Sequence, residues 1–220
     1  MSPESCYARR VGSSEGDRGP GTGGDLDATV RGLLESGDLD GAATRALEHY
    51  GPELYGFLRA IARDDDLASD AFALGSEQLW RNLARFRWEA SLRTWTYQLF
   101  RHALYQVRSD PRRRPDRNLP LSIVNSIANV HRSVTAPYQR TEVKESLRAL
   151  REALDPLDHE ILVLRLDRAM SWKDIARALG EAGDSDALVE QRAAAFRKRF
   201  ERAKAQLREL AVKHGLLPEG

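Results

Sequence analysis

Apolar residues recur three and four positions apart from Leu26 onwards, and alternating runs of β-branched residues are scarce. This spacing puts apolar side chains on one face of an α-helix. In the first half of the chain it predicts long helices over residues 39–63, 67–86 and 91–108. The run Asp64-Asp65-Asp66 is expected to end one helix and begin the next. The pattern therefore predicts an all-α fold.

A Pro- and Arg-rich segment interrupts the helical pattern. SDPRRRPDRNLP, residues 109–120, contains three Pro and four Arg, and Pro removes both an N–H donor and helical freedom. A stretch without secondary structure as long as residues 111–140 is unusual inside a compact domain. We therefore expect two small helical domains joined by a flexible linker. The expected bounds are a disordered leader at 1–24, a first domain at 25–110, the linker at 111–140 and a second domain at 141–216.

The second domain carries clear helix-start and helix-stop signals. Asp155, followed by Pro, suits a helix N-terminus, and Ser171 opens a capping-box pattern. Gly180 is expected to stop that short helix, and a basic amphipathic helix follows at about 187–214. This order favours a helix-turn-helix. A helical bundle with a charged last helix fits the same pattern.

Charge is distributed unevenly although the formal net charge is only +1. Residues 25–77 hold twelve acidic residues against four Arg, a balance of −8. Residues 78–117 hold ten Arg against three acidic residues (+7), and residues 189–214 hold eight basic residues against three acidic ones (+5). Two basic zones suggest two polyanion-facing surfaces, and the alternative is that both are solvated helix faces.

Several function classes have no support in the composition. Cys6 is the only cysteine, which excludes a disulfide framework or a cysteine zinc site within one chain. A Gly-rich phosphate loop and a His/Cys cluster are both missing, so we expect no enzyme activity, no cofactor and no metal. Asp64-Asp65-Asp66 fits a helix boundary better than a divalent-cation site. The leader has no apolar core and no apolar run approaches about 20 residues, so we expect a cytoplasmic protein.

The helix expected at 91–108 has two different faces. On a helical wheel of about 100° per residue, an ordinary core face contains Leu92, Thr96, Leu99, Phe100, Ala103 and Val107. A neighbouring flank contains Trp95, Gln98, His102 and Tyr105, with Arg101 just beyond. An unpaired base offers a π-face for stacking, edges for hydrogen bonding and a phosphate for charge, so this flank suits single-stranded nucleic acid.

Two more aromatic residues precede this helix. Phe86 and Trp88 lie in the expected break, where a loop could surround an extruded base. The alternative is that Phe86, Trp88 and Trp95 pack the domain. The loop and the flank together favour single-strand binding.

These residues carry a resemblance to a known family. FRWEASLRTWTYQLFRHAL resembles the segment of sigma-70-family transcription factors that melts promoter DNA, particularly in the extracytoplasmic-function group, where a phrase like FRGDASLRTWLYRIARNAL is typical. DAFALGSEQLWRNLARF resembles the polymerase-binding helix of the group. ALDPLDHEILVLRL, MSWKDIARALG and FRKRFERAKAQLREL resemble its C-terminal helix-turn-helix domain, in family order.

The resemblance implies an initiation subunit of bacterial RNA polymerase. The first domain would bind core polymerase and capture the unpaired strand of the minus-ten element, and the second would bind the minus-thirty-five element as duplex. We predict minus-ten contacts from Phe86, Arg87, Trp88, Glu89, Ser91, Trp95, Gln98, Arg101, His102 and Tyr105. We predict minus-thirty-five contacts from Gln191, Arg192, Arg197, Lys198, Arg199, Arg202 and Lys204. We predict core polymerase contacts from Asp70, Leu74, Glu77, Gln78 and Arg81.

Three departures from the family pattern affect these predictions. Trp88-Glu89 replaces the usual Gly-Asp of the base-capture loop, and His102 replaces the usual Asn. Ala73-Leu74 replaces Gln-Glu in the polymerase-binding helix, where Gly75 also costs roughly 1 kcal/mol of helix propensity relative to Ala. GEAGDSDALVEQRAA replaces a short turn, so either the recognition helix is extended at its N-terminus or the insert is a short extra helix.

The expected partners are core RNA polymerase and promoter DNA, without membrane insertion. An anti-sigma factor often holds members of the family inactive, which makes one a further candidate partner. The alternative function is a stand-alone helix-turn-helix regulator with a sigma-like fold, which would bind duplex DNA without polymerase.

Overall fold

The computed structural model describes residues 23–110 and 153–213. Every regular element in these two ranges is helical, which confirms the predicted all-α class for the described residues. Most of the expected leader, the whole expected linker and the ends of the second domain (141–152 and 214–216) lie outside them. Gly23 and Gly24, which we assigned to the leader, begin the first helix instead.

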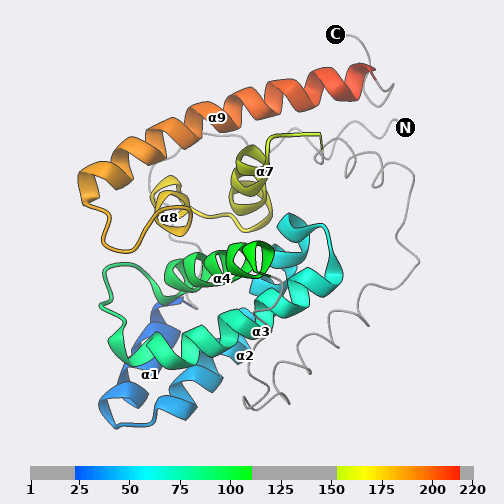
Figure 1. Ribbon diagram of the computed structural model, residues 1–220. Coiled ribbons are helices and arrows are strands. Elements are labelled where there is room, and N and C mark those ends of the chain that lie inside the picture. The colour runs from blue at the N-terminus through cyan, green and yellow to red at the C-terminus, as the bar shows by residue number, and fades with distance from the viewer. Residues whose placement is uncertain (1–22, 111–152, 214–220) are drawn as a thin grey trace, which may run out of the picture.

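Residues 23–110 fold into four α-helices, which we call the first helical unit (Figure 1). Its elements are α1 (Gly23–Glu35), α2 (Leu39–Ala62), α3 (Asp65–Asn82), the 3-10 turn η1 (Leu83–Arg85) and α4 (Leu92–Ser109). The three helices predicted from apolar spacing correspond to α2, α3 and α4. The helix expected to run to Phe86 ends at Asn82 and continues as η1.

The acidic run between α2 and α3 acts as a helix boundary, as predicted. The Asp64 carboxylate accepts a hydrogen bond from the Leu67 N–H (2.8 Å) and caps the N-terminus of α3. Asp65 pairs with the Arg59 guanidinium (2.8 Å). Arg63 ends α2 in the left-handed region (φ 62°), a common way to terminate a helix. In the two described ranges, no group of His, Cys, Asp and Glu side chains could hold a metal ion.

The core of the first unit depends on close contact between α3 and α4. Phe72 and Phe100 are fully buried with their ring centroids 5.3 Å apart. A Cβ added at Gly75 would lie 2.7 Å from the Phe100 Cδ1 and 2.8 Å from its Cγ. Gly75 is therefore the residue that lets the Phe100 ring approach α3, which explains why this helix accepts a glycine.

Residues 153–213 form the second helical unit. Its elements are α7 (Pro156–Leu162), the π-helical segment η3 (Val163–Asp167), α8 (Trp172–Ala178) and α9 (Asp186–Lys213). Asp155 and Ser171 cap α7 and α8 through the backbone N–H groups of Leu157 and Asp174, as predicted. Between α8 and α9 lies a non-helical connection, residues 179–185, so the expanded turn extends α9 at its N-terminus rather than forming an extra helix.

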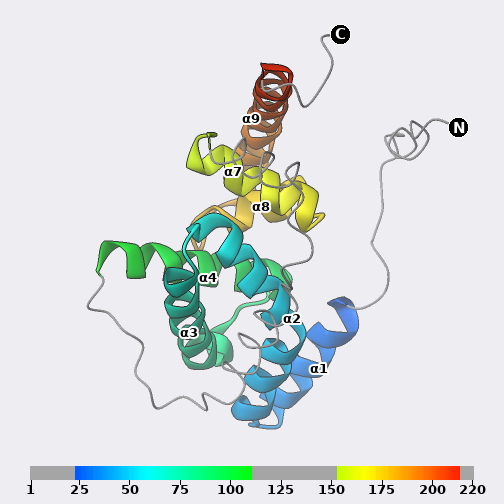
Figure 2. The same cartoon turned by 90° about the vertical axis from the view of Figure 1, so that its right-hand side faces the viewer.

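The two units lie directly against each other (Figures 1 and 2). The second unit contacts the first mainly through α8 on α4 and through α7 and η3 on α2. Buried side chains of both units belong to one continuous cluster, which includes Phe57 and Tyr97 from the first unit and Ile161 and Ile175 from the second. The arrangement decides which surfaces of α4 are open to solvent.

Candidate nucleic-acid interface

The core face predicted for α4 is confirmed. Five of its six residues are buried and Leu99 is partly buried: Leu92, Thr96, Phe100, Ala103 and Val107 are the buried five. Tyr97 and Leu104 are also fully buried, which the wheel did not indicate. Their burial follows from α2, because the Tyr97 ring packs edge-on against Phe57 at a centroid distance of 5.0 Å. The buried arc of α4 is therefore wider than that of a helix that packs against a neighbour on one side only.

The loop before α4 builds an aromatic cluster with the helix. Phe86 stacks on Trp95 (centroids 4.6 Å apart, planes at 22°) and contacts Trp88 at 4.8 Å. The Arg31 guanidinium of α1 covers the Trp88 ring at 4.4 Å. The three aromatic rings are each partly buried. The three rings therefore pack against the first unit and still keep part of their surface accessible. Their positions are thus compatible both with packing of the domain and with binding of a single strand.

Trp88 has an unusual backbone conformation. Its φ is 60°, a left-handed conformation that glycine adopts without strain and that costs a residue with a Cβ about 1–2 kcal/mol. The family phrase has glycine at this position. The loop thus keeps a glycine-type backbone while carrying an indole ring, and the contacts with Phe86 and Arg31 offset that strain.

The flank of α4 faces the second helical unit. The Gln98 amide donates a hydrogen bond to the Gly180 carbonyl (2.9 Å), and the His102 Nε2 lies 3.9 Å from the Glu181 Oε2. Burial lowers the pKa of His102, against the opposing effect of Glu181. Near the start of the helix, the Thr94 hydroxyl donates to the Asp174 carboxylate, which is a contact that helical periodicity could not predict.

Glu160 of α7 binds two further residues of the flank. Its carboxylate accepts a hydrogen bond from the Arg101 Nε (2.7 Å) and a short one from the Tyr105 hydroxyl. The Arg101 guanidinium also covers the Tyr105 ring at 4.7 Å. Burial and the hydrogen bond to Glu160 raise the pKa of Tyr105. Glu160 itself is only 2% exposed, and these two side chains donate one hydrogen bond to each of its carboxylate oxygens in place of water.

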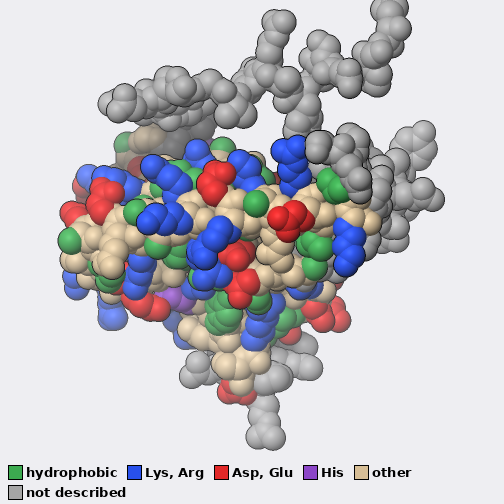
Figure 3. Space-filling view, turned by 90° about the horizontal axis from the view of Figure 1, so that it is seen from above, with side chains coloured by type: hydrophobic (Ala, Val, Ile, Leu, Met, Phe, Trp, Pro, Cys, Tyr) green, Lys and Arg blue, Asp and Glu red, His purple; other side chains and the backbone are tan. Residues whose placement is uncertain are grey.

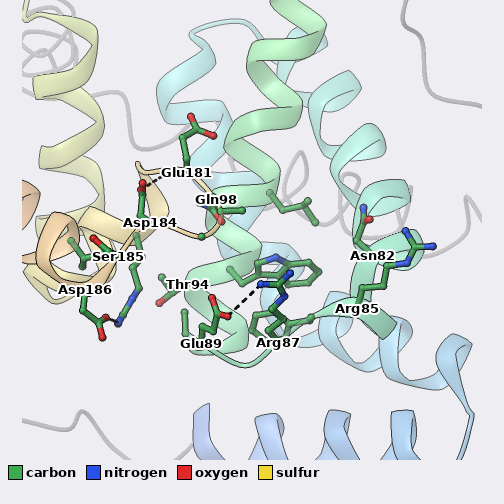
Figure 4. A pocket seen from close by; sticks show the side chains of 18 residues that line it. Asn82, Arg85, Arg87, Glu89, Thr94, Gln98, Glu181, Asp184, Ser185 and Asp186 are labelled. Atoms are coloured by element: carbon green, nitrogen blue, oxygen red, sulfur yellow. Dashed lines mark hydrogen bonds and ion pairs between the residues drawn. The ribbon is translucent and has the colours of Figure 1, made fainter.

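A cavity of about 790 Å³ opens beside the aromatic cluster, between the loop before α4 and the connection from α8 to α9. Figure 4 shows Gln98 and Thr94 between a wall with Asp184 and Ser185 and an opposite side with Arg85 and Arg87. Trp95 and Leu99 supply the apolar part of the lining. The cavity thus offers a stacking surface on which an unpaired base could lie. Its charged lining is mixed, with the basic side chains of Arg85, Arg87 and Arg177 beside the acidic ones of Glu89, Glu181, Asp184 and Asp186.

The five residues predicted to contact polymerase follow one stripe of α3, at helical spacing. Arg81 is exposed, and Asp70 and Leu74 are partly exposed. Glu77 is 7% exposed and pairs with Arg81 (2.6 Å), and the Gln78 amide donates to Gln106 of α4 (2.8 Å). The accessible part of the stripe is therefore smaller than predicted.

Trp80, beside this stripe, was not among the predicted contacts. It is 40% exposed, and its Nε1–H donates to the Asp40 carboxylate of α2 (2.7 Å). A large exposed aromatic next to charged residues is a common feature of protein interfaces. Periodicity marks Trp80 only as one more apolar position of α3, so sequence reasoning had no signal for its exposure.

The basic residues predicted on the last helix divide into two groups. Gln191, Arg197, Lys198, Arg202 and Lys204 are exposed, and Lys and Arg side chains gather over α9 in Figure 3. Arg199 instead binds Asp155 (2.8 Å) and Asp158 (2.6 Å), and the hydrogen bond to Asp158 raises the pKa of its guanidinium. Arg192 pairs with Asp184 in the connection before α9. Arg192 and Arg199 therefore stabilise the second unit in this arrangement.

Phe196 and Phe200 of α9 are buried, which confirms the prediction that they belong to the core. Phe200 packs edge-on against Trp172 of α8 at 5.3 Å. This contact holds α8 against α9 and leaves the opposite face of α9 to solvent. No helix among the described residues is long and apolar enough to cross a membrane.

Comparison with known proteins identifies one part of the chain. Residues 46–114 match the family model of sigma-70 region 2. No curated protein and no solved structure matches the chain significantly. The matched segment begins within α2 and contains α3, the aromatic cluster and all of α4. These residues thus form a region 2 of the sigma-70 type.

Proposed function

We propose that this chain is an alternative sigma factor of the extracytoplasmic-function group, which directs core RNA polymerase to specific promoters. Region 2 gives it a sigma factor role in polymerase binding and promoter melting, and it is a domain of initiation factors rather than of a catalytic enzyme family. The proposal adds the subgroup, the roles of individual residues and a second DNA contact through α9. As a partner of polymerase, the protein would act in the cytoplasm on the nucleoid.

One observation carries the proposal for region 2. The matched segment contains an aromatic stack, Phe86 on Trp95, that borders a cavity with the basic side chains of Arg85 and Arg87. Stacking on an aromatic ring contributes about 1–3 kcal/mol per base. We propose that this stack holds an unpaired base of the minus-ten element while the arginines bind its phosphates.

We propose that the other residues of the α4 flank extend this contact along the strand. Arg101 would bind a phosphate, and Gln98, His102 and Tyr105 would hydrogen-bond to base edges or sugars. An imidazole at position 102 replaces the amide usual in the family, so we expect a base preference that differs from that of typical members.

We propose that α9 reads the minus-thirty-five element in the major groove. Gln191, Lys198 and Arg202 share the face of α9 opposite its buried Phe196 and Phe200, and all three are exposed. An arginine can bind guanine with two hydrogen bonds, whereas lysine mainly contacts phosphate. Arg197 and Lys204 lie on the adjoining flank, where phosphate contacts are expected.

We propose that α3 binds core polymerase through Asp70, Leu74 and Arg81. These residues lie on a different side of the first unit from the α4 flank, which faces the second unit. Trp80 is a further candidate for this contact because of its exposure. An anti-sigma factor remains a candidate partner that would compete for the same surfaces.

The experiment that tests this function is run-off transcription on a randomised promoter pool, with and without core polymerase. Transcripts that require both proteins would support the sigma factor role and reveal both promoter elements. Alanine at Trp88, Trp95 or His102 should impair promoter opening without loss of core binding. Alanine at Gln206, an exposed polar residue of α9 that we assign to no contact, is a matched control and should leave opening unchanged.

A specific observation favours the second candidate function, a stand-alone duplex-binding regulator. The exposed face of α9 is accessible while the flank of α4 is covered by the second unit. Specific binding of duplex DNA without polymerase, together with no transcripts in its presence, would establish this alternative and overturn the proposal.

A further inference from the structure

Helix α1 lies outside the segment that matches sigma-70 region 2, which begins at residue 46. Its apolar residues Leu26 and Val30 are buried in the core of the first unit. The Asp27 carboxylate accepts a hydrogen bond from the Leu92 N–H at the start of α4 (3.4 Å). These contacts hold α1 beside the loop that precedes α4. Arg31 follows Asp27 at a spacing of four residues, so both side chains lie on the same face of α1.

Arg31 forms one end of the aromatic cluster. Its guanidinium carbon lies 4.4 Å from the centroid of the Trp88 ring. Trp88 contacts Phe86 (4.8 Å), and Phe86 stacks on Trp95 (4.6 Å), so the contacts run without a break from α1 to α4. The glycine that is usual at position 88 in the family phrase would leave no ring under Arg31. The cation over the cluster is therefore a feature of this chain.

The Arg31 guanidinium is exposed and has polar capacity to spare. Within residues 23–110 and 153–213 it forms neither a hydrogen bond nor an ion pair, whereas Arg87 pairs with Glu89 (3.8 Å). Burial raises the pKa of Asp27 and the charge of Arg31 opposes that rise, but the two side chains do not form an ion pair. A guanidinium that stacks on an aromatic face keeps its N–H edge free to donate, and this edge can bind a phosphate with two hydrogen bonds.

We propose that Arg31 binds a backbone phosphate of the promoter single strand, next to the nucleotide that the aromatic cluster holds, and that Trp88 positions its guanidinium for this contact. The inference rests on the proposed function of the cluster and adds a DNA-binding residue on a helix outside the matched region 2. Figures 1 and 2 place α1 at the end of the first unit away from α9. The captured strand would therefore extend from the cluster towards α1, away from the second unit.

The test measures binding of a fluorescein-labelled single strand of randomised sequence to the complex of the protein with core polymerase. Fluorescence anisotropy reports binding, and core polymerase alone is the reference. Each phosphate that a cation neutralises on a single strand contributes about 0.7 to the slope of log binding constant against log salt concentration. Arg31→Gln should reduce this slope by about 0.7 and weaken binding about tenfold at low salt. Arg31→Lys keeps the charge and should retain the slope.

Arg45→Gln is the matched control. Arg45 is an exposed arginine of α2 that pairs with Glu48 (3.7 Å) and that we assign to no DNA contact. The variant has the same change in net charge as Arg31→Gln, so its affinity and salt slope should stay close to those of the parent. Co-elution of each variant with core polymerase at every salt concentration checks that the complex is intact.

A double-mutant cycle tests the role of Trp88. Trp88→Gly removes the ring and places at φ 60° a residue that adopts this conformation without strain. If the ring positions Arg31, then Arg31→Gln should cost less affinity in the Trp88→Gly background than in the parent, because both changes remove one shared contact. Equal costs in the two backgrounds would overturn the positioning role of Trp88.

The outcomes separate this inference from the proposed function. A parent complex that binds the strand no better than core polymerase alone would overturn the inference, and the additional absence of polymerase-dependent transcripts would overturn the proposed function. Strand binding and transcripts in the parent, with unchanged affinity and slope in Arg31→Gln, would overturn the inference alone, as would an equal loss in Arg45→Gln. A slope that falls in Arg31→Gln and is restored in Arg31→Lys would support the phosphate contact.

Discussion

Replacing Gly75 by alanine should destabilise the first helical unit although it improves the helix propensity of α3. The new Cβ would lie 2.7, 2.8 and 3.0 Å from Cδ1, Cγ and Cε1 of Phe100, well inside van der Waals contact. The Phe100 ring is fully buried and lies against Phe72, so it has little room to move. Steric overpacking of this kind typically costs about 1–3 kcal/mol, whereas the Gly-to-Ala change contributes about 1 kcal/mol to the helix.

We therefore expect Gly75→Ala to lower the free energy of unfolding by about 1–2 kcal/mol. This figure is the upper part of the overpacking cost, chosen because the buried ring has little room to move, minus the gain in helix propensity. Each kcal/mol corresponds to about 4–8 °C in Tm for a cooperative unit of this size. Circular dichroism during thermal and urea unfolding measures the change. Gly32→Ala is the control, because an added Cβ there meets nothing within 4 Å and only the helix propensity should change, so its Tm should rise.

A Gly75→Ala protein as stable as the parent, or more stable, would refute this reasoning. It would mean that Phe100 adjusts at little cost and that the glycine in α3 has another origin. The result also bears on polymerase binding. If Gly75 is present because Phe100 packs against it, then this difference from the family pattern lies in the core and does not alter the exposed residues of α3 that are proposed to bind polymerase.

Three further predictions follow from the site. Trp88→Gly should be more stable than Trp88→Ala by about 1 kcal/mol in urea unfolding, the reverse of the usual order, because φ at this position is 60°; equal stabilities would contradict the assigned backbone. Arg199→Ala should lower the free energy of unfolding by about 1 kcal/mol and leave the salt dependence of duplex binding unchanged. Lys198→Ala should instead reduce the slope of log binding constant against log salt concentration by about one, without loss of stability. Burial against the second unit lowers the pKa of His102 below its ordinary 6.5, so His102 binds a proton more readily when the two units separate, and the contact between them should weaken as pH falls through and below 6.5. Energy transfer between dyes on cysteines introduced at Asp66 of α3 and Gln206 of α9, in a Cys6→Ser background, should fall with this loss, and His102→Gln should reduce the fall. An unchanged pH profile in that variant would exclude His102 as the cause.

The sequence alone determined those features that depend on residues three or four positions apart. Helix spacing located α2, α3 and α4 within a few residues of their observed ends, Asp155 and Ser171 were identified as caps, and the run Asp64–Asp66 was identified as a helix boundary. The same spacing separated the core face of α4 from its polar flank. A helical repeat and a cap are local interactions, so their signals lie next to each other in the chain.

Contacts between distant residues were decided only by the tertiary structure. Nothing in the pattern around Glu160 indicates that it binds Arg101, which lies 59 positions away. Arg199 had the same basic character as Lys198 in the sequence, yet it turns to the aspartates of α7 while Lys198 faces solvent. Gly75 was read as a cost in helix propensity until the Phe100 ring was found against it. The physical reason is that packing brings together side chains whose separation in sequence is arbitrary, so neither periodicity nor composition records which donor meets which acceptor.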